Sequence, residues 1–226
     1  MNIAVILSAG AGLRFKSSCP KQFLILGAKP TLVHSLCKFQ EYEKINKILV
    51  VSNPEYLEET KKLCHDFSKN LGVINGGERR QDSVWNALLW IKQNVPSCKN
   101  VLIHDSARPL FSIKLLDRLF ETMAKHEAAI PCIATDDTIK QRSGNKVIKT
   151  LDRANLVRVQ TPQAFNFAKI YEAYLSFPKD NIATDDAFVA ELFGINVQIV
   201  EGDSRNIKIT HPSDMMVAEL LIKEDC

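Results

Sequence analysis

Residues 3–14 read IAVILSAGAGLR, an apolar run that leads directly into a glycine-rich loop. Glycines let the backbone approach an anion closely, and the N–H groups of such a loop and of a helix start carry partial positive charge. Arg14 and Lys21 add two full charges in and just after this loop. The segment predicts a strand followed by a phosphate-binding loop, with an ordinary glycine turn as the alternative.

Two common nucleotide-binding motifs do not fit this loop. The dinucleotide fingerprint needs a third glycine where Phe15 stands, and the predicted second strand, residues 47–51, ends without a carboxylate for the ribose. The Gly-Lys-Ser/Thr tripeptide of P-loop NTPases occurs nowhere in the chain. The remaining possibility is a nucleotide-binding loop whose positive charges come from side chains further along the chain. Such a loop suits group transfer from a nucleoside triphosphate better than hydride transfer.

Length and composition predict one α/β domain over residues 1–226, because single cores usually split only beyond about 250 to 300 residues. Hydrophobic residues make up 46% and charged residues 24%, as in globular proteins. The net charge of +3 is too small to indicate a nucleic-acid partner, and no apolar run approaches the roughly 20 residues of a membrane span. Six cysteines without a Cys-x-x-Cys pair predict reduced thiols. We therefore expect a cytoplasmic protein with neither nucleic acid nor membrane as a partner.

Strand and helix patterns alternate through the first part of the chain. The predicted strands are residues 3–8, 47–51, 73–74, 101–103 and 128–134, and the helical patterns between them begin near Pro30, Asn53, Ser83 and Ser112. Such alternation predicts a Rossmann-like, mainly parallel twisted sheet with helices on both faces. Polar loops follow the first, third and fourth strands, and ligands bind at the carboxyl ends of the strands in such sheets. The loops should therefore form one site.

The pattern changes in the second half of the chain. Residues 138–140 and 146–148 flank a glycine turn, which indicates a β-hairpin. We expect residues 136–160 to form a protruding arm that reaches a partner subunit, with residues 156–159 as its return strand; a solvent-facing flap is the alternative. Later patterns predict helices at residues 166–175, 184–193 and 212–221 and short strands at 197–200 and 207–209.

In the order and spacing of its motifs, the chain resembles the cytidylyltransferases that act on polyol phosphates, over almost its whole length. The resemblance rests on SAGAGLRF at 8–15, PKQF at 20–23, GGERRQDSV at 76–84, HDSARP at 104–109, DTIK at 137–140, DR at 152–153, QTPQAF at 160–165, TDD at 184–186 and NIKIT at 206–210. The family usually has alanine where Ser8 and Ser106 stand. Ser106 is also familiar from enzymes that act on ribitol 5-phosphate, which keeps that branch open. Residues 81–84, 137–140 and 151–153 look more like the branch that acts on 2-C-methyl-D-erythritol 4-phosphate.

The resemblance implies transfer of the cytidylyl group from CTP to 2-C-methyl-D-erythritol 4-phosphate, with release of pyrophosphate, in the non-mevalonate route to isoprenoid precursors. A phosphate oxygen of the acceptor would attack the α-phosphorus of CTP. Because both reactants are anions, catalysis should come from cations held in a dry cleft. The resemblance assigns this part to Arg14, Lys21 and Lys208. The presence of all three argues against the alternative of a nucleotide-binding regulatory module without turnover.

Further residues match the binding positions of the family. For CTP they are Ser8, Ala9, Gly10, Gly12, Gly77, Glu78, Ser83, Asp105 and Ala107. For the acceptor they are Arg108, Thr138, Arg153, Thr161, Thr184 and Thr210. Thr184 could instead serve only as the N-cap of a helix. The resemblance also implies a homodimer, in which Arg153 and its neighbours on the arm reach the site of the other subunit.

A divalent cation is implied as well. In the family, Mg²⁺ is held mainly by the phosphates of CTP, so no protein ligand is assigned, although the carboxylate of Asp105 at a strand end would suit a hard cation. The five histidines show no His-Glu-x-x-His spacing, which gives a zinc site little support.

Overall fold

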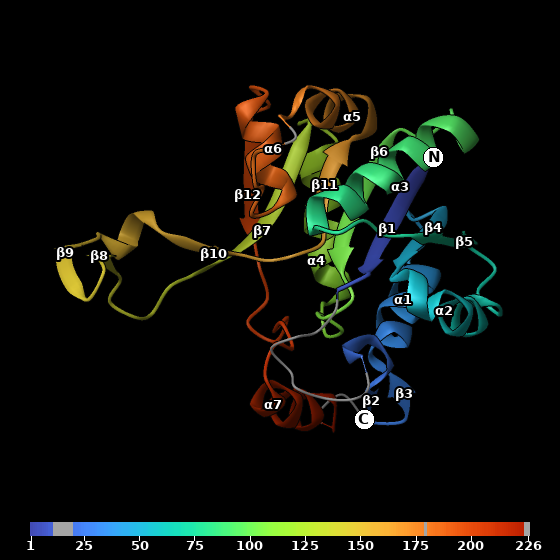
Figure 1. Cartoon of the computed structure of the whole chain (residues 1–226), viewed down its shortest axis with the longest axis horizontal. Coiled ribbons are helices and arrows are strands. Elements are labelled where there is room, and N and C mark those ends of the chain that lie inside the picture. The colour runs from blue at the N-terminus through green and yellow to red at the C-terminus, as the bar shows by residue number, and fades with distance from the viewer. Residues whose placement is uncertain (11–19, 179, 224–226) are drawn as a thin grey trace.

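A twisted sheet of eight strands forms the centre of the protein in the computed structural model (Figure 1). The structure describes residues 1–10, 20–178 and 180–223. In this part of the chain, the strands follow the order β10-β7-β11-β6-β1-β4-β5, with β12 beside β7. Their bounds are Asn2–Ser8 (β1), Lys47–Ser52 (β4), Asn70–Asn75 (β5), Asn100–Asp105 (β6), Ala128–Ala134 (β7), Val157–Val159 (β10), Gln163–Asn166 (β11) and Val197–Glu201 (β12).

Most neighbouring strands of the sheet run parallel. β1 pairs in parallel with β4 on one side and with β6 on the other, β5 follows β4, and β12 runs parallel to β7. β11 lies antiparallel between β6 and β7, and β10 pairs antiparallel with the end of β7. The prediction of a mainly parallel sheet is confirmed. β11 was not predicted, because its residues were identified only as part of a sequence motif and not as a strand.

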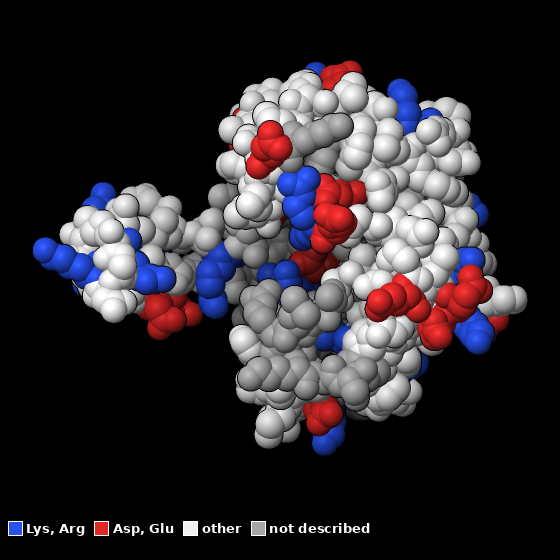
Figure 2. Space-filling model, viewed as in Figure 1, with Lys and Arg blue, Asp and Glu red and all other residues white. Residues whose placement is uncertain are grey.

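A two-stranded arm projects from the edge of this sheet, and Figure 2 shows it standing clear of the rest of the molecule. β8 (Lys140–Ser143) and β9 (Lys146–Thr150) pair antiparallel around Gly144, whose φ of +55° lies in the left-handed region that suits glycine. Every residue of both strands is exposed. The hairpin is confirmed, and β10 forms where the return strand was predicted, although it pairs antiparallel with β7 and not with the hairpin itself.

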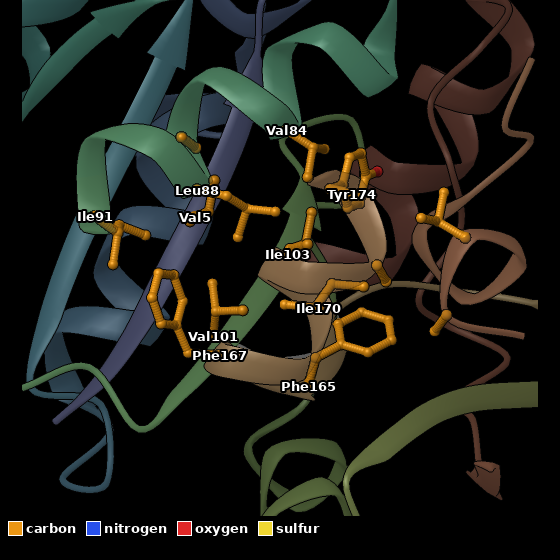
Figure 3. Close-up of a cluster of buried hydrophobic side chains, with 14 of the residues drawn as sticks. Val5, Val84, Leu88, Ile91, Val101, Ile103, Phe165, Phe167, Ile170 and Tyr174 are labelled. Atoms are coloured by element: carbon orange, nitrogen blue, oxygen red, sulfur yellow. The ribbon is translucent and has the colours of Figure 1, made fainter. Parts of the chain in front are cut away.

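Helices cover both faces of the sheet, as predicted. One face carries α1 (Thr31–Glu41), α2 (Leu57–Cys64) and α4 (Ile113–Met123), and the other carries α3 (Arg80–Asn94), α5 (Phe167–Ser176) and α6 (Asp186–Leu192). The side chains of β1 alternate between the faces: Ile3, Val5 and Leu7 pack on the α3 side, and Ala4 and Ile6 on the α1 side. Figure 3 shows the α3 side of this core. Burial of each large aliphatic side chain contributes about 1.5–3 kcal/mol.

A small third cluster fixes the segment that follows β12. Leu26 of the short strand β2 (Ile25–Leu26) packs with Ile209 and with Ala218 of α7, the last helix (Pro212–Lys223). The N–H of Ile209 donates to the carbonyl of Ala107 at 2.8 Å. The segment around residue 209 is therefore held against the loop that follows β6. Short elements complete this region, namely β3 (Lys29–Pro30) beside β2 and a 3₁₀ turn at Lys21–Phe23.

Three details of the predicted secondary structure are wrong, namely one short strand and the ends of two helices. The described residues 207–209 form no strand, because the N–H of Ile207 bonds locally to the carbonyl of Arg205. The helix opened by Asn53 begins as a 3₁₀ turn at Pro54–Tyr56, and α2 ends at Cys64 rather than near residue 67. The N-cap of α6 is Asp185 and not Thr184, since the Asp185 carboxylate accepts from the N–H of Phe188 at 3.0 Å.

Two expectations from composition can be compared with the described residues. None of the helices in the described ranges is long and apolar enough to cross a bilayer. The cysteines described as free thiols are Cys37, Cys64, Cys98 and Cys132, which agrees with the expectation of reduced cysteines.

Candidate active site

A cavity opens at the edge of the sheet where β1 and β6 end. Its volume of about 620 Å³ lies in the range of small-molecule sites. Figure 2 shows acidic and basic side chains gathered around a hollow in the middle of this face. The predicted residues that line it are Ala9, Gly10, Lys21, Gly77, Glu78, Ser83, Asp105, Ala107, Lys208 and Thr210. The polar loops that were expected to form one site therefore meet here.

Close backbone packing joins the first two loops. A Cβ on Gly76 would lie 2.4 Å from the Cβ of Ala9 and 2.9 Å from Oγ of Ser83. A Cβ on Gly77 would lie 2.4 Å from the Cβ of Asp82, so glycine is required at both positions. The N–H of Gly77 donates to Oγ of Ser83 at 3.0 Å. Gly77 and Ser83, both predicted to bind CTP, are thus hydrogen-bonded to each other.

The carboxylate of Asp105, at the end of β6, lies at the centre of the charged groups in this cavity. Its Oδ2 accepts from Nζ of Lys208 at 2.6 Å, and its Oδ1 accepts from Nε of Arg80 at 3.0 Å. Burial by itself raises the pKa of Asp105, but the charges of Arg80 and Lys208 outweigh burial and hold this pKa well below its usual range. Asp105 is therefore ionised, and Lys208 is paired with it.

Arg80 is anchored from behind by a second carboxylate, that of Asp186. Nη1 and Nη2 of Arg80 lie 3.0 and 2.8 Å from the two oxygens of Asp186, which makes a bidentate pair. Asp186 is fully buried and also accepts the O–H of Tyr174 at 2.6 Å. Burial by itself lowers the pKa of Arg80, but the charges of Asp186 and Asp105 raise it well above its ordinary value. Arg80 therefore stays charged.

Arg80 and Asp186 are site residues that the sequence reasoning missed. Both belong to motifs that carry the family resemblance, but neither was assigned a role. One signal was present: Asp185 is enough to cap α6, so the acidic residue after it needed another explanation. The partner of Asp186 lies 106 residues away in the chain, which no local pattern reveals.

A second cavity of about 270 Å³ adjoins the first and shares Arg80, Asp105 and Lys208 with it. Three of the predicted acceptor residues line this smaller cavity, namely Arg108, Thr161 and Thr184. The guanidinium of Arg108 donates to the carbonyl of Asn206 at 2.8 Å, which ties the loop after β6 to the segment that carries Lys208.

The hydroxyl of Thr161 is engaged inside the protein. It accepts from the N–H of Asp105 at 3.1 Å and lies 3.0 Å from Nδ1 of His104. Burial lowers the pKa of His104 to about 3, so its ring is neutral. Nε2 lies 3.1 Å from the carbonyl of Arg108, which can only accept, so Nε2 carries the proton and Nδ1 accepts from Thr161. Thr161 therefore braces the end of β6.

The two described lysines of the predicted catalytic set lie at the same cavity. Nζ of Lys21 donates to the carbonyl of Thr210 at 2.9 Å, close to the segment that carries Lys208. The N–H of Thr210 is held in turn by the carboxylate of Asp214 at 2.7 Å. The side chain of Lys21 is thus directed at the rim of the cavity.

The remaining predicted residues lie elsewhere. Ser8 is buried, and its hydroxyl has no hydrogen-bond partner in the part of the chain that the structure describes. Thr138 and Arg153 lie on the arm and line neither cavity. Gly12 and Arg14 fall outside the described residues.

No group of three or more potential metal-ligating side chains occurs within the described ranges. Asp105 was considered as a ligand, but each of its oxygens already accepts from a cation. A divalent ion beside it would lie close to the charges of Arg80 and Lys208, which repel it. Among the described residues, Asp105 therefore presents no open carboxylate oxygen to a divalent ion.

Comparisons with known proteins also find cytidylyltransferases that act on a polyol phosphate. The family model of 2-C-methyl-D-erythritol 4-phosphate cytidylyltransferase (IspD) matches residues 2–224. The enzyme of that name from Geobacillus kaustophilus is 40% identical over 222 residues, 97% of this chain and 96% of that protein. The bifunctional enzyme IspD/IspF of Pelagibacter ubique is 42% identical over 217 residues, which are 96% of this chain but only 56% of that protein. The crystal structure of the Francisella tularensis 2-C-methyl-D-erythritol 4-phosphate cytidylyltransferase matches with a TM-score of 0.82 and 34% identity, covering 97% of this chain and 99% of that one.

Proposed function

Because this chain belongs to the 2-C-methyl-D-erythritol 4-phosphate cytidylyltransferase family, it transfers the cytidylyl group of CTP to that polyol phosphate, and we propose that it does so in the cavity around Asp105. The reaction yields 4-diphosphocytidyl-2-C-methyl-D-erythritol and pyrophosphate and serves isoprenoid synthesis. The observation that carries the placement is the gathering of Lys21, Arg80 and Lys208 at one cavity beside the strand ends. Ribitol 5-phosphate loses its support as the acceptor, since the family model and these relatives carry the name of the methylerythritol enzyme.

The charges of the substrates explain the proposed roles. A phosphate oxygen of the acceptor attacks the α-phosphorus of CTP, one P–O bond forms as the bond to pyrophosphate breaks, and no bond to the protein is needed. Repulsion between the two anions opposes this approach. Lys21 and Lys208 would offset that repulsion, together with Arg14. Loss of one such contact should cost about 3–4 kcal/mol of transition-state stabilisation.

The binding parts follow from the two cavities. The larger cavity would hold CTP, with its base against Gly77, Glu78 and Ser83, which line that cavity. The smaller cavity would hold the acceptor, with its phosphate near Arg108. Lys208 lines both cavities, so it would face both reacting phosphates.

Mg²⁺ is proposed to enter bound to the phosphates of CTP, where it would neutralise charge on the departing pyrophosphate. Calorimetry would check it: Mg²⁺ titrated into the protein alone should give no saturable binding, whereas Mg²⁺ should tighten the binding of CTP. A cytoplasmic location is expected for an enzyme that uses CTP, and it stays a prediction.

Release of pyrophosphate tests the activity. The protein is supplied with CTP and Mg²⁺, and with 2-C-methyl-D-erythritol 4-phosphate or D-ribitol 5-phosphate in parallel. Turnover with the first and little with the second is the expected result. Preference for ribitol 5-phosphate would assign the chain to that branch, and CTP binding without turnover on either acceptor would favour the regulatory module.

The arm is proposed to complete the site of a second copy of this chain. Val147 and Ile148 of β9 are each 58% exposed, and a lone two-stranded hairpin is marginally stable in water. Arg153 lies on this arm and lines neither cavity of its own subunit. In a homodimer, the apolar residues would be buried and Arg153 would reach the acceptor phosphate in the partner's cavity.

Complementation between two inactive variants tests this arrangement. Lys208→Met damages the cavity, and Arg153→Ala damages the arm. In a mixed dimer obtained by co-expression, one site combines an intact cavity with an intact arm from the other subunit, so activity should return. If each arm served its own subunit, the mixture would stay inactive.

The oligomeric state provides a second test of the arm. The double substitution Val147→Asp with Ile148→Asp should give an inactive monomer by light scattering. Leu175→Asp with Leu192→Asp is the matched control, because those side chains are 63% and 58% exposed on the body of the protein, and it should behave like the wild type. A dimeric, active arm variant would sink the proposal.

A further inference from the structure

Arg80 lies at the junction of the two cavities, and the proposed reaction assigns no role to it. In the described ranges, the cavities share Arg80 with Asp105 and Lys208. All three nitrogens of its guanidinium meet carboxylates: Nε donates to Asp105 at 3.0 Å, and Nη1 and Nη2 donate to Asp186 at 3.0 and 2.8 Å. These bonds use three of the five N–H groups of the guanidinium and fix its orientation in the protein.

These contacts form a continuous line of alternating charge. The line runs from Lys208 through Asp105 and Arg80 to Asp186, where the hydroxyl of Tyr174 ends it. Its members come from the segment after β12, from β6, α3 and α6, and from α5. Asp186 and Tyr174 line neither cavity, so the buried end of the line does not touch either substrate in the proposed arrangement.

The geometry of the line decides where the ammonium of Lys208 lies. A planar guanidinium gripped by two oxygens of Asp186 has a fixed orientation, so its Nε presents one hydrogen bond in one direction. That bond holds Oδ1 of Asp105, and Oδ2 then faces Lys208. The Lys208 side chain is 41% exposed and has a flexible stem, so its ammonium needs such a reference point.

We propose that Arg80, anchored on Asp186, is a positioning residue that fixes Asp105 and thereby holds the ammonium of Lys208 where the two substrates meet. The inference rests on the proposed function of Lys208. It extends the machinery of the reaction to a buried carboxylate on α6 that contacts neither substrate.

Arg80→Lys separates geometry from charge. Lysine keeps the positive charge between the two carboxylates, but its ammonium cannot hold them in the planar fork of an arginine. The variant should fold, and its kcat should fall by roughly a hundredfold, the effect of a displacement of about 1 Å in a catalytic group. KM for CTP should change little, because Arg80→Lys keeps the positive charge at the cavity that would hold the nucleotide.

Arg80→Met removes the charge as well. Besides Arg80, the charged and titratable groups that face Asp105 are Lys208, Arg108 and the neutral His104. With one of the two main cations gone, the acid side of the pH profile of kcat should move to higher pH in Arg80→Met and stay in place in Arg80→Lys. If Arg80 had only a structural role, its substitution would lower the folded fraction without shifting the acid side of the pH profile of kcat.

Arg118→Met is the matched control. Arg118 also joins two elements, through the carbonyls of Glu201 at 2.8 Å and Gly202 at 3.2 Å, and lines neither cavity. Thermal unfolding of every variant accompanies the kinetics. Unchanged kcat in both Arg80 variants, or an equal fall in Arg118→Met, would overturn the proposal.

A readout without substrate keeps this proposal separate from the proposed function. The ¹⁵N NMR signal of the Lys208 ammonium, assigned by its loss in Lys208→Met, should be that of an immobilised group in the wild type. The signal should broaden or disappear in Arg80→Lys. An unchanged signal would overturn the positioning role even in an active enzyme, whereas a wild type without acceptor-dependent pyrophosphate release would overturn only the proposed function.

Discussion

The ammonium of Lys208 lies 2.6 Å from Oδ2 of Asp105, so the cation that is proposed to meet the reacting phosphates is already paired in the free protein. The Lys208 side chain is 41% exposed, but that of Asp105 is only 12% exposed, so removal of Lys208 leaves a nearly buried carboxylate with Arg80 as its remaining cation. In Lys208→Met, the melting temperature should therefore fall, while Arg80 keeps the variant folded. kcat should fall by roughly 10²–10³-fold, which corresponds to losing one charge-stabilising donor. Steady-state kinetics and thermal unfolding would check this, and a variant that keeps its kcat would refute it.

Gly76→Ala should weaken CTP binding and stability together. The new Cβ would lie 2.4 Å from the Cβ of Ala9, so the first two loops must move apart. Overpacking of this kind costs about 1–3 kcal/mol. Ala9→Gly removes the nearest clashing atom, and the double variant should regain part of both properties. Calorimetry with CTP and chemical unfolding measure the cycle, and strictly additive losses would show that the two loops do not touch as described.

Thr161 distinguishes a structural hydroxyl from a substrate ligand. Thr161→Val leaves the buried N–H of Asp105 and Nδ1 of His104 without partners. Such unsatisfied groups cost about 1–3 kcal/mol each, so the loss of both partners should lower the free energy of unfolding by about 2–6 kcal/mol. Thr161→Ser keeps the hydroxyl and should retain most of the stability. If Thr161→Val proved fully stable and only KM for the acceptor rose, the hydroxyl would belong to substrate binding alone.

His104 should make the folded protein less stable in mild acid. Burial lowers its pKa to about 3 from the ordinary value of 6.5. Between these values the unfolded chain binds a proton that the folded chain does not, so the free energy of unfolding falls as the pH drops through this window. The slope is about 1.4 kcal/mol per pH unit, or about 2 kcal/mol lost at pH 5.

Urea unfolding at pH 7.5, 6 and 5 would measure this slope. His104→Gln should be less stable at neutral pH, because the buried hydrogen bonds are remade imperfectly, but it should lack most of the slope. The pKa of His34 is also lowered by burial, and since His34 is present in both proteins, the difference between the two slopes isolates His104. Identical slopes would place the titrating group elsewhere.

Patterns along the chain were sufficient for the sheet and its loops. The apolar runs of β1 and β6 predict buried parallel strands. The glycines and cations in the loop after β1 predict a phosphate site. β11 escaped notice because its antiparallel pairing with β6 depends on chain folding back over a long separation. The strand expected at residues 207–209 did not form, because the N–H of Ile207 bonds locally to Arg205 and that of Ile209 bonds to Ala107 in the loop after β6. A β-like composition does not decide between such contacts and a strand ladder.

The sequence by itself determined the fold class, the meeting of three loops at one sheet edge and, through its motifs, the kind of reaction. All of these depend on residue type and spacing within short segments. Only the tertiary structure decided how the charges are paired. Arg80 and Asp186 stand 106 residues apart, and whether a buried carboxylate meets a cation depends on the packing of α3 against α5 and of α5 against α6. Burial and pairing are properties of the folded chain. They place Arg80 and Asp186, which come from two different motifs, where they can hold Asp105 and Lys208 in position.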